Sequence, residues 1–231
     1  MDCVRILRVT EKTTLLLASN SPRRKQLLAL GNWEFIVAVS DVDETQQEGE
    51  PPKDYVLRLA EAKALTALEK AQGQDLVIIG SDTAVVDADS ILGKPTDSED
   101  AARMLNQLRG HTHQVYTAVT LHRVRDGKTL SELCVTDVPM RDYTDDEIVS
   151  YIQTGDPLDK AGAYAIQHPD FQPAKSMRGC YASVMGLPMC HVTRALQGLD
   201  VPPLANLPTA CRKLLSYECP VSGAILRGEI S

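Results

Sequence analysis

The chain has 231 residues, of which 43% are hydrophobic and 24% are charged, and its formal net charge at pH 7 is -7. This length suits one large domain, or one domain with two lobes, and the apolar content is too high for a disordered chain. The acidic balance argues against a nucleic-acid partner, because non-specific affinity for a polyanion comes from Lys and Arg. A local basic pocket for a small anion is compatible with it.

The sequence gives no sign of a membrane partner. It contains no apolar run of the roughly eighteen residues that a membrane span requires. Residues 13–18 are too short for the core of a signal peptide, and the polar run SNSPRRK follows them. We therefore expect a cytoplasmic protein.

The beginning of the chain predicts a strand, a helix and a second strand. Residues 14–18 are typical of a buried strand. Ser21 followed by Pro22 predicts a helix start, since Ser caps helices well and Pro suits the first helical position. Gly31 predicts the end of that helix, and residues 33–39 predict the second strand.

A long helix and a third strand come next. Residues 40–50 are polar and acidic and predict a loop, and residues 52–72 have apolar side chains at helical spacing. Lys63 lies on or beside the apolar stripe of that helix. Residues 75–79 predict a third, buried strand.

The middle of the chain predicts two hairpins with a helix between them. One hairpin covers residues 83–92, and the other joins strands 112–124 and 129–140 through the turn Arg-Asp-Gly-Lys. Thr96 and Glu99 match a capping box and predict the start of the helix that lies between the two hairpins. Helices that alternate with strands and are followed by a strand pair predict an α/β fold with a mixed sheet.

The last third is less regular. Thr144 and Glu147 match a second capping box, and residues 188–198 predict another helix. Residues 155–187 are rich in Gly, Pro and single polar residues and predict no regular element. From residue 201 the chain is rich in proline, which predicts a loosely packed tail.

The segment Ser19-Asn20-Ser21-Pro22-Arg23-Arg24 lies between the first predicted strand and helix. Such a turn offers free backbone N–H groups at the positive end of a helix dipole. Arg23 and Arg24 add planar donor groups that match phosphate oxygens. The pattern lacks the glycines and lysine of a P-loop. It favours phosphate binding, and the alternative is an ordinary capped helix with two solvated arginines.

Acidic residues occur in two further segments. Gly80-Ser81-Asp82-Thr83 directly follows the third predicted strand, where α/β proteins often bind ligands. Asp82 could hold a divalent metal or accept a proton from water, or it could simply cap the next element. The loop Asp41-Val42-Asp43-Glu44 offers more carboxylates, although acidic loops are usually just solvated.

Two lysines and a glutamine are further candidates. Lys63 needs a reason for its place beside an apolar stripe, unless it only extends its ammonium to water. Lys94, in Gly-Lys-Pro, could neutralise phosphate charge or be a surface lysine. The small residues of segment 159–167 allow close backbone approach, and Gln167 offers both a donor and an acceptor for reading a base. The alternative for this segment is a Gly-Ala turn that leads into a core strand.

Six cysteines are present, and no pair has C-x-x-C spacing. The pattern therefore gives little sign of a zinc site or redox pair. Four of the six lie in the last third of the chain, near His191. Free thiols are the favoured interpretation, and a structural metal near His191 is the alternative.

Six motifs occur in order: LLLASNSPRR, SDVDET, RLAEAKA, IIGSDT, LGKP and DKAGAYAIQ. Together they resemble the Maf family of nucleotide pyrophosphatases from about residue 14 to residue 200. The resemblance implies an elongated, two-lobed α/β fold with a mixed sheet and a central cleft, similar to the inosine triphosphate pyrophosphatases. It implies one domain over residues 1–200, followed by a tail of unknown role over residues 201–231. It also implies a homodimer.

The resemblance implies roles for individual residues. Asp82 matches the family's catalytic acidic residue, which is a proton acceptor and metal ligand. Glu44 matches an acidic cleft residue that helps to hold the divalent metal cation, Mg²⁺ or Mn²⁺. The matches to the family's phosphate-binding groups are Ser19, Arg24, Lys63 and Lys94.

Three positions distinguish branches of the family. Arg23, Thr83 and Gln167 match the branch that hydrolyses dTTP and UTP to the monophosphate and pyrophosphate, a house-cleaning reaction. The motifs VDET and IIGSD locally resemble the 7-methyl-GTP branch, and residues 168–175 depart from the family pattern. The alternatives are a 7-methyl-GTP or an inosine/xanthosine triphosphate pyrophosphatase, and a non-catalytic nucleotide-binding regulator of cell division.

Overall fold

The structure, a computed structural model, describes residues 13–71 and 75–230. In these parts of the chain one six-stranded sheet has the order β2-β1-β3-β5-β6, and β4 pairs with β3. β1 runs parallel to β2 and β3, and the other pairs are antiparallel. The strands are β1 (Thr14–Leu17), β2 (Phe35–Val37), β3 (Leu76–Asp87), β4 (Ser90–Leu92), β5 (Thr112–Arg123) and β6 (Thr129–Pro139). The predicted α/β fold with a mixed sheet is confirmed.

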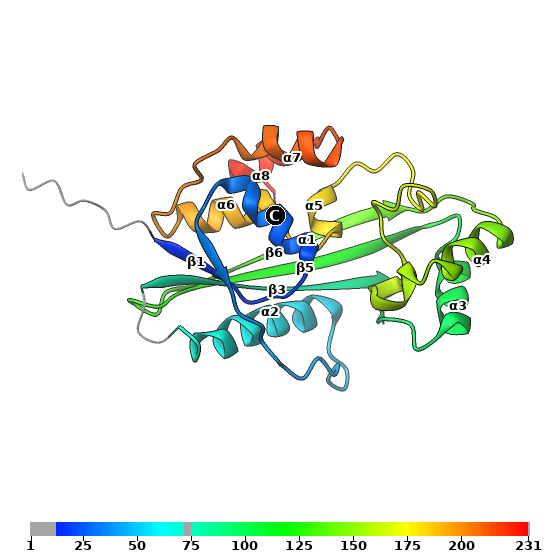
Figure 1. Cartoon of the computed structure of the whole chain (residues 1–231), viewed down its shortest axis with the longest axis horizontal. Helices are drawn as coiled ribbons and strands as arrows, with labels where there is room; N and C mark the ends of the chain where they lie inside the picture. The colour runs from blue at the N-terminus through cyan, green and yellow to red at the C-terminus, as the bar shows by residue number, and fades with distance from the viewer. Residues whose placement is uncertain (1–12, 72–74, 231) are drawn as a thin grey trace, which may run out of the picture.

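Helices cover both faces and one end of this sheet. They are α1 (Pro22–Leu28), α2 (Pro52–Leu68), α3 (Ser98–Leu108), α4 (Asp145–Gln153), α5 (Tyr181–Val184), α6 (Met189–Gln197), α7 (Leu207–Leu215) and α8 (Ser222–Leu226). α2 lies along one face, α1 and α5 to α8 lie on the other, and α3 and α4 lie at one end (Figure 1). The long strands β3, β5 and β6 join that end to the rest, which makes the molecule elongated. Among the described residues, no helix has the length and apolar content to cross a membrane.

α2 packs unusually close to β3. A Cβ atom built on Gly80 would lie 2.1 Å from the carbonyl oxygen of Ala60 and 2.7 Å from the backbone nitrogen of Ala64. Glycine in β3 and alanines in α2 therefore permit an approach that larger side chains would block. The same buried face of α2 carries Lys63, as its place beside the apolar stripe predicted.

One edge of β3 is free of strand partners in its middle. β1 pairs with Leu76–Ile79, β4 pairs with Val85–Asp87 on the same edge, and β5 occupies the opposite edge throughout. Between Ile79 and Val85 that edge has no strand partner within the described ranges. The prediction that Asp82 follows the end of a strand is wrong: because β5 pairs with β3 continuously as far as Val86, Asp82 lies inside the strand.

The two predicted capping boxes differ in outcome. Thr144 and Glu147 form a complete box at the start of α4, as predicted. The box expected at Thr96 and Glu99 is shifted by one residue, because the side chain of Asp97 accepts the hydrogen bond from the backbone N–H of Asp100.

The end of the chain is not a loosely packed tail. It forms α7 and α8, in which Leu207 and Ile225 are buried. The indole N–H of Trp33 donates to the carbonyl of Pro202 at 3.1 Å, and Arg194 of α6 donates to the carbonyl of Ile225 at 3.0 Å. Both helices are short and follow prolines, so their apolar positions formed no clear periodic pattern in the sequence.

Candidate functional site

A cavity of about 360 Å³ opens beside the unpaired middle of β3. Cavities of this size bind small ligands. Every site residue predicted from the sequence lines it except Ser19. The lining consists of Ser21, Pro22, Arg23, Arg24, Glu44, Lys63, Asp82, Thr83, Val85, Lys94, Val115, Asp159, Lys160, Ala161, Tyr164, Ala165, Ile166, Gln167, Val184, Met185 and Gly186.

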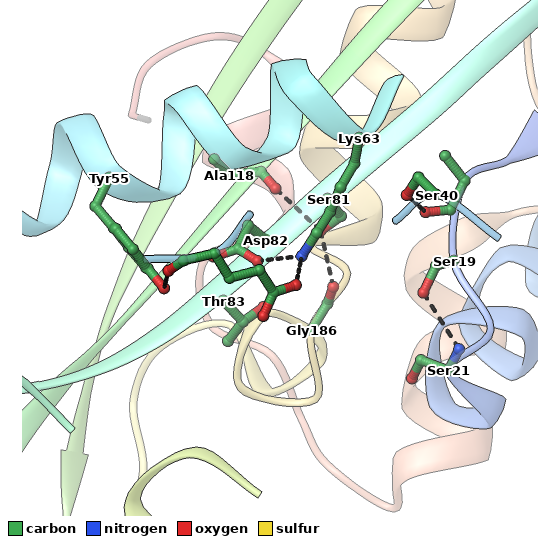
Figure 2. Close-up of polar contacts among 12 residues, drawn as sticks. Ser19, Ser21, Ser40, Tyr55, Lys63, Ser81, Asp82, Thr83, Ala118 and Gly186 are labelled. Carbon is green, nitrogen blue, oxygen red and sulfur yellow. Dashed lines mark hydrogen bonds and ion pairs between the residues drawn. The ribbon is translucent and has the colours of Figure 1, made fainter. Parts of the chain in front are cut away.

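Lys63 joins two carboxylates from different elements. Its Nζ lies 2.6 Å from Asp82 Oδ1 and 2.6 Å from Glu44 Oε1. Figure 2 shows Lys63 pointing toward Asp82. Lys63 and Asp82 are buried, whereas the side chain of Glu44 is half exposed. The positive charge of Lys63 is thus shared between two carboxylates, which explains why a lysine is stable on the buried face of α2.

Glu44 is held as a carboxylate. Burial raises its pKa, but the hydrogen bond and charge of Lys63, with the charges of Lys94 and Arg24, outweigh burial and bring the pKa below its ordinary value. The hydroxyl of Tyr55 donates to the backbone carbonyl of Glu44 at 2.9 Å, which attaches the acidic loop to α2. Burial, and then the charges of Asp82 and Glu44, raise the pKa of Tyr55 to about 12, so this donor keeps its proton.

Arg24 is oriented by neutral acceptors. Its Nε donates to the carbonyl of Gly186 at 2.8 Å, and its terminal nitrogens donate to the hydroxyls of Ser19 and Thr83, each at 3.3 Å. Burial lowers the pKa of Arg24, and the carboxylate of Asp82 opposes this effect. Neutral acceptors fix the direction of the guanidinium without cancelling its charge, so it remains available to an anion.

Ser19 lies behind Arg24 instead of lining the cavity. Its hydroxyl accepts from the backbone N–H of Ser21 at 3.2 Å (Figure 2). It also accepts from a terminal nitrogen of Arg24 at 3.3 Å. The structure therefore gives Ser19 a place that supports the Arg24 guanidinium. Its predicted contact with phosphate stays a prediction.

The contact between Ser81 and Gly186 could not be predicted from the sequence. The buried hydroxyl of Ser81 donates to the carbonyl of Gly186 at 3.0 Å (Figure 2). The same carbonyl accepts from Arg24. Gly186 has φ +104°, and a Cβ atom there would lie 3.2 Å from Arg24 Nε. A glycine before Leu-Pro was the only sequence signal for this contact, and it is too common to identify a site.

The remaining lining divides into apolar and polar groups. The apolar surface comes from β3, β5, the segment after η3 (Ala161–Ala163) and the residue after α5. It includes Val85, Val115, Tyr164, Ile166 and Met185. Such a surface suits a flat heterocycle.

Three polar side chains of the lining are unpaired. Within the described ranges, neither Arg23 nor Lys94 has an ion-pair partner, and the amide of Gln167 has no hydrogen bond. All three side chains line the cavity. The site therefore offers uncompensated cations and a free amide beside an apolar wall.

The carboxylates suit a divalent cation that is shared with a ligand. In the part of the chain that the structure describes, no group of three or more His, Cys, Asp or Glu side chains is arranged to hold a metal ion. Asp82 and Glu44 nevertheless converge, since each contacts the Lys63 ammonium through one oxygen. Mg²⁺ is commonly bound by one or two carboxylates together with substrate phosphates and water. Their hard oxygen donors fit Mg²⁺ or Mn²⁺ in that form.

Comparison with known proteins identifies the family of the chain. The sequence model of the family described as Maf-like protein matches residues 14–199. The dTTP/UTP pyrophosphatase of Geotalea uraniireducens is 46% identical over 187 residues, covering 80% of this chain and 95% of that protein. The dTTP/UTP pyrophosphatase of Geobacter sulfurreducens is 44% identical over 188 residues, covering 81% and 97%.

A partial structural likeness was also found. A nucleoside-triphosphatase (dITP/XTP pyrophosphatase) from Mycobacterium abscessus matches with a TM-score of 0.33 and 17% identity, covering 57% of this chain and 76% of that chain. The assignment depends on the sequence matches alone. They span most of this chain and nearly all of the two relatives. On these matches, the chain belongs to the Maf family.

Proposed function

We propose that this protein is a nucleoside triphosphate pyrophosphatase that hydrolyses dTTP and UTP to the monophosphate and pyrophosphate. The observation that carries the proposal is one cavity in which the paired carboxylates of Asp82 and Glu44 lie among the cations of Arg24 and Lys94. A triphosphate needs cations to bind it and an acidic group to activate water, and this cavity holds both. The relatives named dTTP/UTP pyrophosphatase support the substrate class.

Binding of the triphosphate falls to the cations of the lining. Arg24 is already oriented by Gly186, Ser19 and Thr83, so its guanidinium loses little freedom when it binds a phosphate. Lys94 is exposed at the cavity and adds charge. Lys63 already contacts both carboxylates. We therefore propose that it interacts with phosphate only while it stays beside them.

Hydrolysis requires a base beside the α-phosphate. We propose that Asp82 accepts a proton from a water molecule as the water oxygen bonds to the α-phosphorus. The bond from that phosphorus to the α,β-bridging oxygen breaks, and pyrophosphate leaves with the bonding electrons. Lys63 holds the carboxylate of Asp82 in place through a 2.6 Å contact. A divalent cation, Mg²⁺ or Mn²⁺, held by Asp82 and Glu44 with phosphate oxygens would neutralise charge on the phosphates.

Selectivity for pyrimidines is assigned to Arg23, Thr83 and Gln167. The free amide of Gln167 can donate and accept, which complements the O4 and N3–H edge of uracil or thymine. A guanine base would leave such groups unpaired, and mismatches of this kind discriminate strongly. In the structure the Thr83 hydroxyl contacts Arg24 and Thr117, so its part in selectivity acts through those neighbours.

A panel of triphosphates tests the proposal. The purified protein is incubated with dTTP, UTP, 7-methyl-GTP, ITP and XTP, with Mg²⁺ or Mn²⁺, and pyrophosphate release is measured. We expect the highest kcat/KM for dTTP and UTP. We expect no pyrophosphate release after chelation of the metal. A preference for 7-methyl-GTP, ITP or XTP would reject the pyrimidine assignment. Tight binding with no release would favour the regulator.

We further propose, on the family resemblance, that the protein works as a cytoplasmic homodimer. Light scattering after gel filtration should then give twice the chain mass of 25.2 kDa. A single-chain mass across the micromolar range would reject the dimer.

A further inference from the structure

The cavity wall formed by residues 160–167 has almost no regular structure to hold its shape. It contains one 3-10 turn, η3 (Ala161–Ala163), in which Gly162 and Ala163 have positive φ angles of 68° and 59°. Ala165, Ile166 and Gln167 all line the cavity. The backbone N–H of Gly162 donates to the carbonyl of Gly93 at 3.0 Å, and further contacts that position the wall come from side chains.

The hydroxyl of Tyr151 supplies such a contact. It accepts from the backbone N–H of Ala165 at 2.9 Å and donates to Asp156 Oδ2 at 2.7 Å. The other oxygen of Asp156 lies 2.9 Å from Lys160 Nζ. Lys160, at one end of the wall, and Ala165, near its other end, are therefore both attached to the pair formed by the Tyr151 hydroxyl and the Asp156 carboxylate.

Tyr151 is itself held firmly. It is buried on α4, and its ring stacks on Phe171 with centroids 4.2 Å apart and an interplanar angle of 12°. His168 packs against the same ring edge-on, with centroids 4.8 Å apart. Both neighbours come from the loop 168–175, whose sequence departs from the family pattern. Burial raises the pKa of Tyr151, so the hydroxyl stays protonated and can donate to Asp156.

We propose that Tyr151 is a positioning residue that, with Asp156, fixes the wall 160–167 and thereby sets how well the cavity distinguishes nucleobases. This inference rests on the proposed function. Ile166 and Gln167 directly follow the backbone N–H that Tyr151 holds, so a shift at Ala165 moves both. Misplacement of a positioning group by about 1 Å can cost a large factor in rate.

The test substitution is Tyr151→Phe, which removes one hydroxyl and keeps the ring. The matched control is Tyr143→Phe, since Tyr143 is equally buried and contacts the same Phe171 at 4.9 Å. Its hydroxyl donates to the carbonyl of Leu105 on α3 at 2.7 Å and not to a residue of the wall. For each protein, kcat and KM are measured with dTTP and 7-methyl-GTP. Inhibition by inorganic tripolyphosphate, which has no base, is measured alongside.

For Tyr151→Phe we expect KM for dTTP to rise about tenfold and the dTTP to 7-methyl-GTP ratio of kcat/KM to fall about tenfold, the size of one well-placed hydrogen bond. Inhibition by tripolyphosphate should change less than about twofold, because Arg24 is oriented by Gly186, Ser19 and Thr83, which lie outside the wall. Tyr143→Phe should keep the wild-type ratio. An unchanged ratio in Tyr151→Phe, or an equal weakening of tripolyphosphate inhibition, would overturn the inference.

A second pair of variants covers the case in which Tyr151→Phe folds poorly. Asp156→Ala should lower the dTTP to 7-methyl-GTP ratio of kcat/KM. Asp156→Asn can still accept the hydrogen bond from Tyr151, so its ratio should lie between those of Asp156→Ala and wild type. No difference between these two variants and wild type would also overturn the inference. If wild type releases no pyrophosphate, the proposed function fails, and calorimetric Kd values for the two nucleotides then make the same comparison.

Discussion

The ammonium of Lys63 lies 2.6 Å from the carboxylate of Asp82, and both side chains are buried. α2 and β3 pack closely enough for this contact because Gly80 has no side chain where α2 passes. The pair fixes an acidic side chain at the unpaired middle of β3, where the cavity opens. The chemistry that we propose starts from this contact.

Asp82→Asn should reduce turnover of dTTP by roughly 10²- to 10⁴-fold, the usual contribution of a general base. The amide can still accept a hydrogen bond from Lys63, so the melting temperature should stay within a few degrees of wild type. Pyrophosphate release and thermal unfolding measure the two effects. Asp89→Asn, in the exposed β3–β4 turn, is the control and should be active. Near-normal turnover in Asp82→Asn would remove Asp82 from the mechanism.

Arg24→Lys should raise KM for dTTP by about tenfold or more, because a charge-assisted hydrogen bond contributes about 1.5–3 kcal/mol. Lysine keeps the charge but loses the planar group that contacts Gly186, Ser19 and Thr83 at once. Steady-state kinetics measure the change. Arg103→Lys, an exposed residue of α3, receives the same substitution and should behave as wild type. Equal KM values in the two variants would contradict the role of Arg24.

Gly80→Ala should destabilise the fold by at least about 1–3 kcal/mol, the usual cost of overpacking. The new Cβ atom would lie 2.1 Å from a backbone carbonyl oxygen of α2, so the helix has to move. Gly93→Ala is the control, since a Cβ atom there meets nothing within 4 Å among the described residues. Urea unfolding compares the two free energies of unfolding. The same small loss in both variants would show that α2 does not pack this closely.

His113 should make the free energy of unfolding fall in mildly acidic solution. It is buried on β5, its Nε2 lies 2.8 Å from the hydroxyl of Tyr164, and its Nδ1 has no partner within the described ranges. Burial lowers its pKa from 6.5 to about 4, with Asp87 opposing and His111 adding to the effect. Above pH 6.5 the ring is neutral in both states and has no effect.

Below that pH the unfolded chain takes up a proton first, so the free energy of unfolding falls until the folded ring also titrates near pH 4. At pH 5 the loss should be about 2 kcal/mol relative to pH 7.5. Urea unfolding at both pH values measures it, and His113→Gln should lose correspondingly less. An equal loss in wild type and His113→Gln would show that other groups cause the dependence.

Several features could be predicted from local pattern alone. Lys63 stood out because a lysine beside an apolar stripe needs a partner, and the structure supplies two carboxylates. Strands and hairpins were predicted from alternation and turn residues, and β5 and β6 pair as expected. Arg24, Lys94 and Asp82 are far apart in sequence. Only the family resemblance implied that they meet, and in the structure all three line one cavity.

Other features depend on tertiary contacts that no local pattern encodes. Gly80-Ser81-Asp82-Thr83 has the composition of a turn, yet β5 keeps it in a strand. The carbonyl of Gly186 orients Arg24 across 162 residues of sequence, and the hydroxyl of Tyr151 replaces a backbone partner for Ala165. Such contacts are set by packing of whole elements, so only the fold reveals them.

A crystal structure of Asp82→Asn soaked with dTTP and Mg²⁺ tests the central claim most directly, because the slowed variant should retain intact substrate. We expect the phosphates against Arg24 and Lys94, the α-phosphorus facing residue 82 and the thymine beside Ile166 and Gln167. A nucleotide bound elsewhere, or one whose phosphates avoid Arg24, would contradict it.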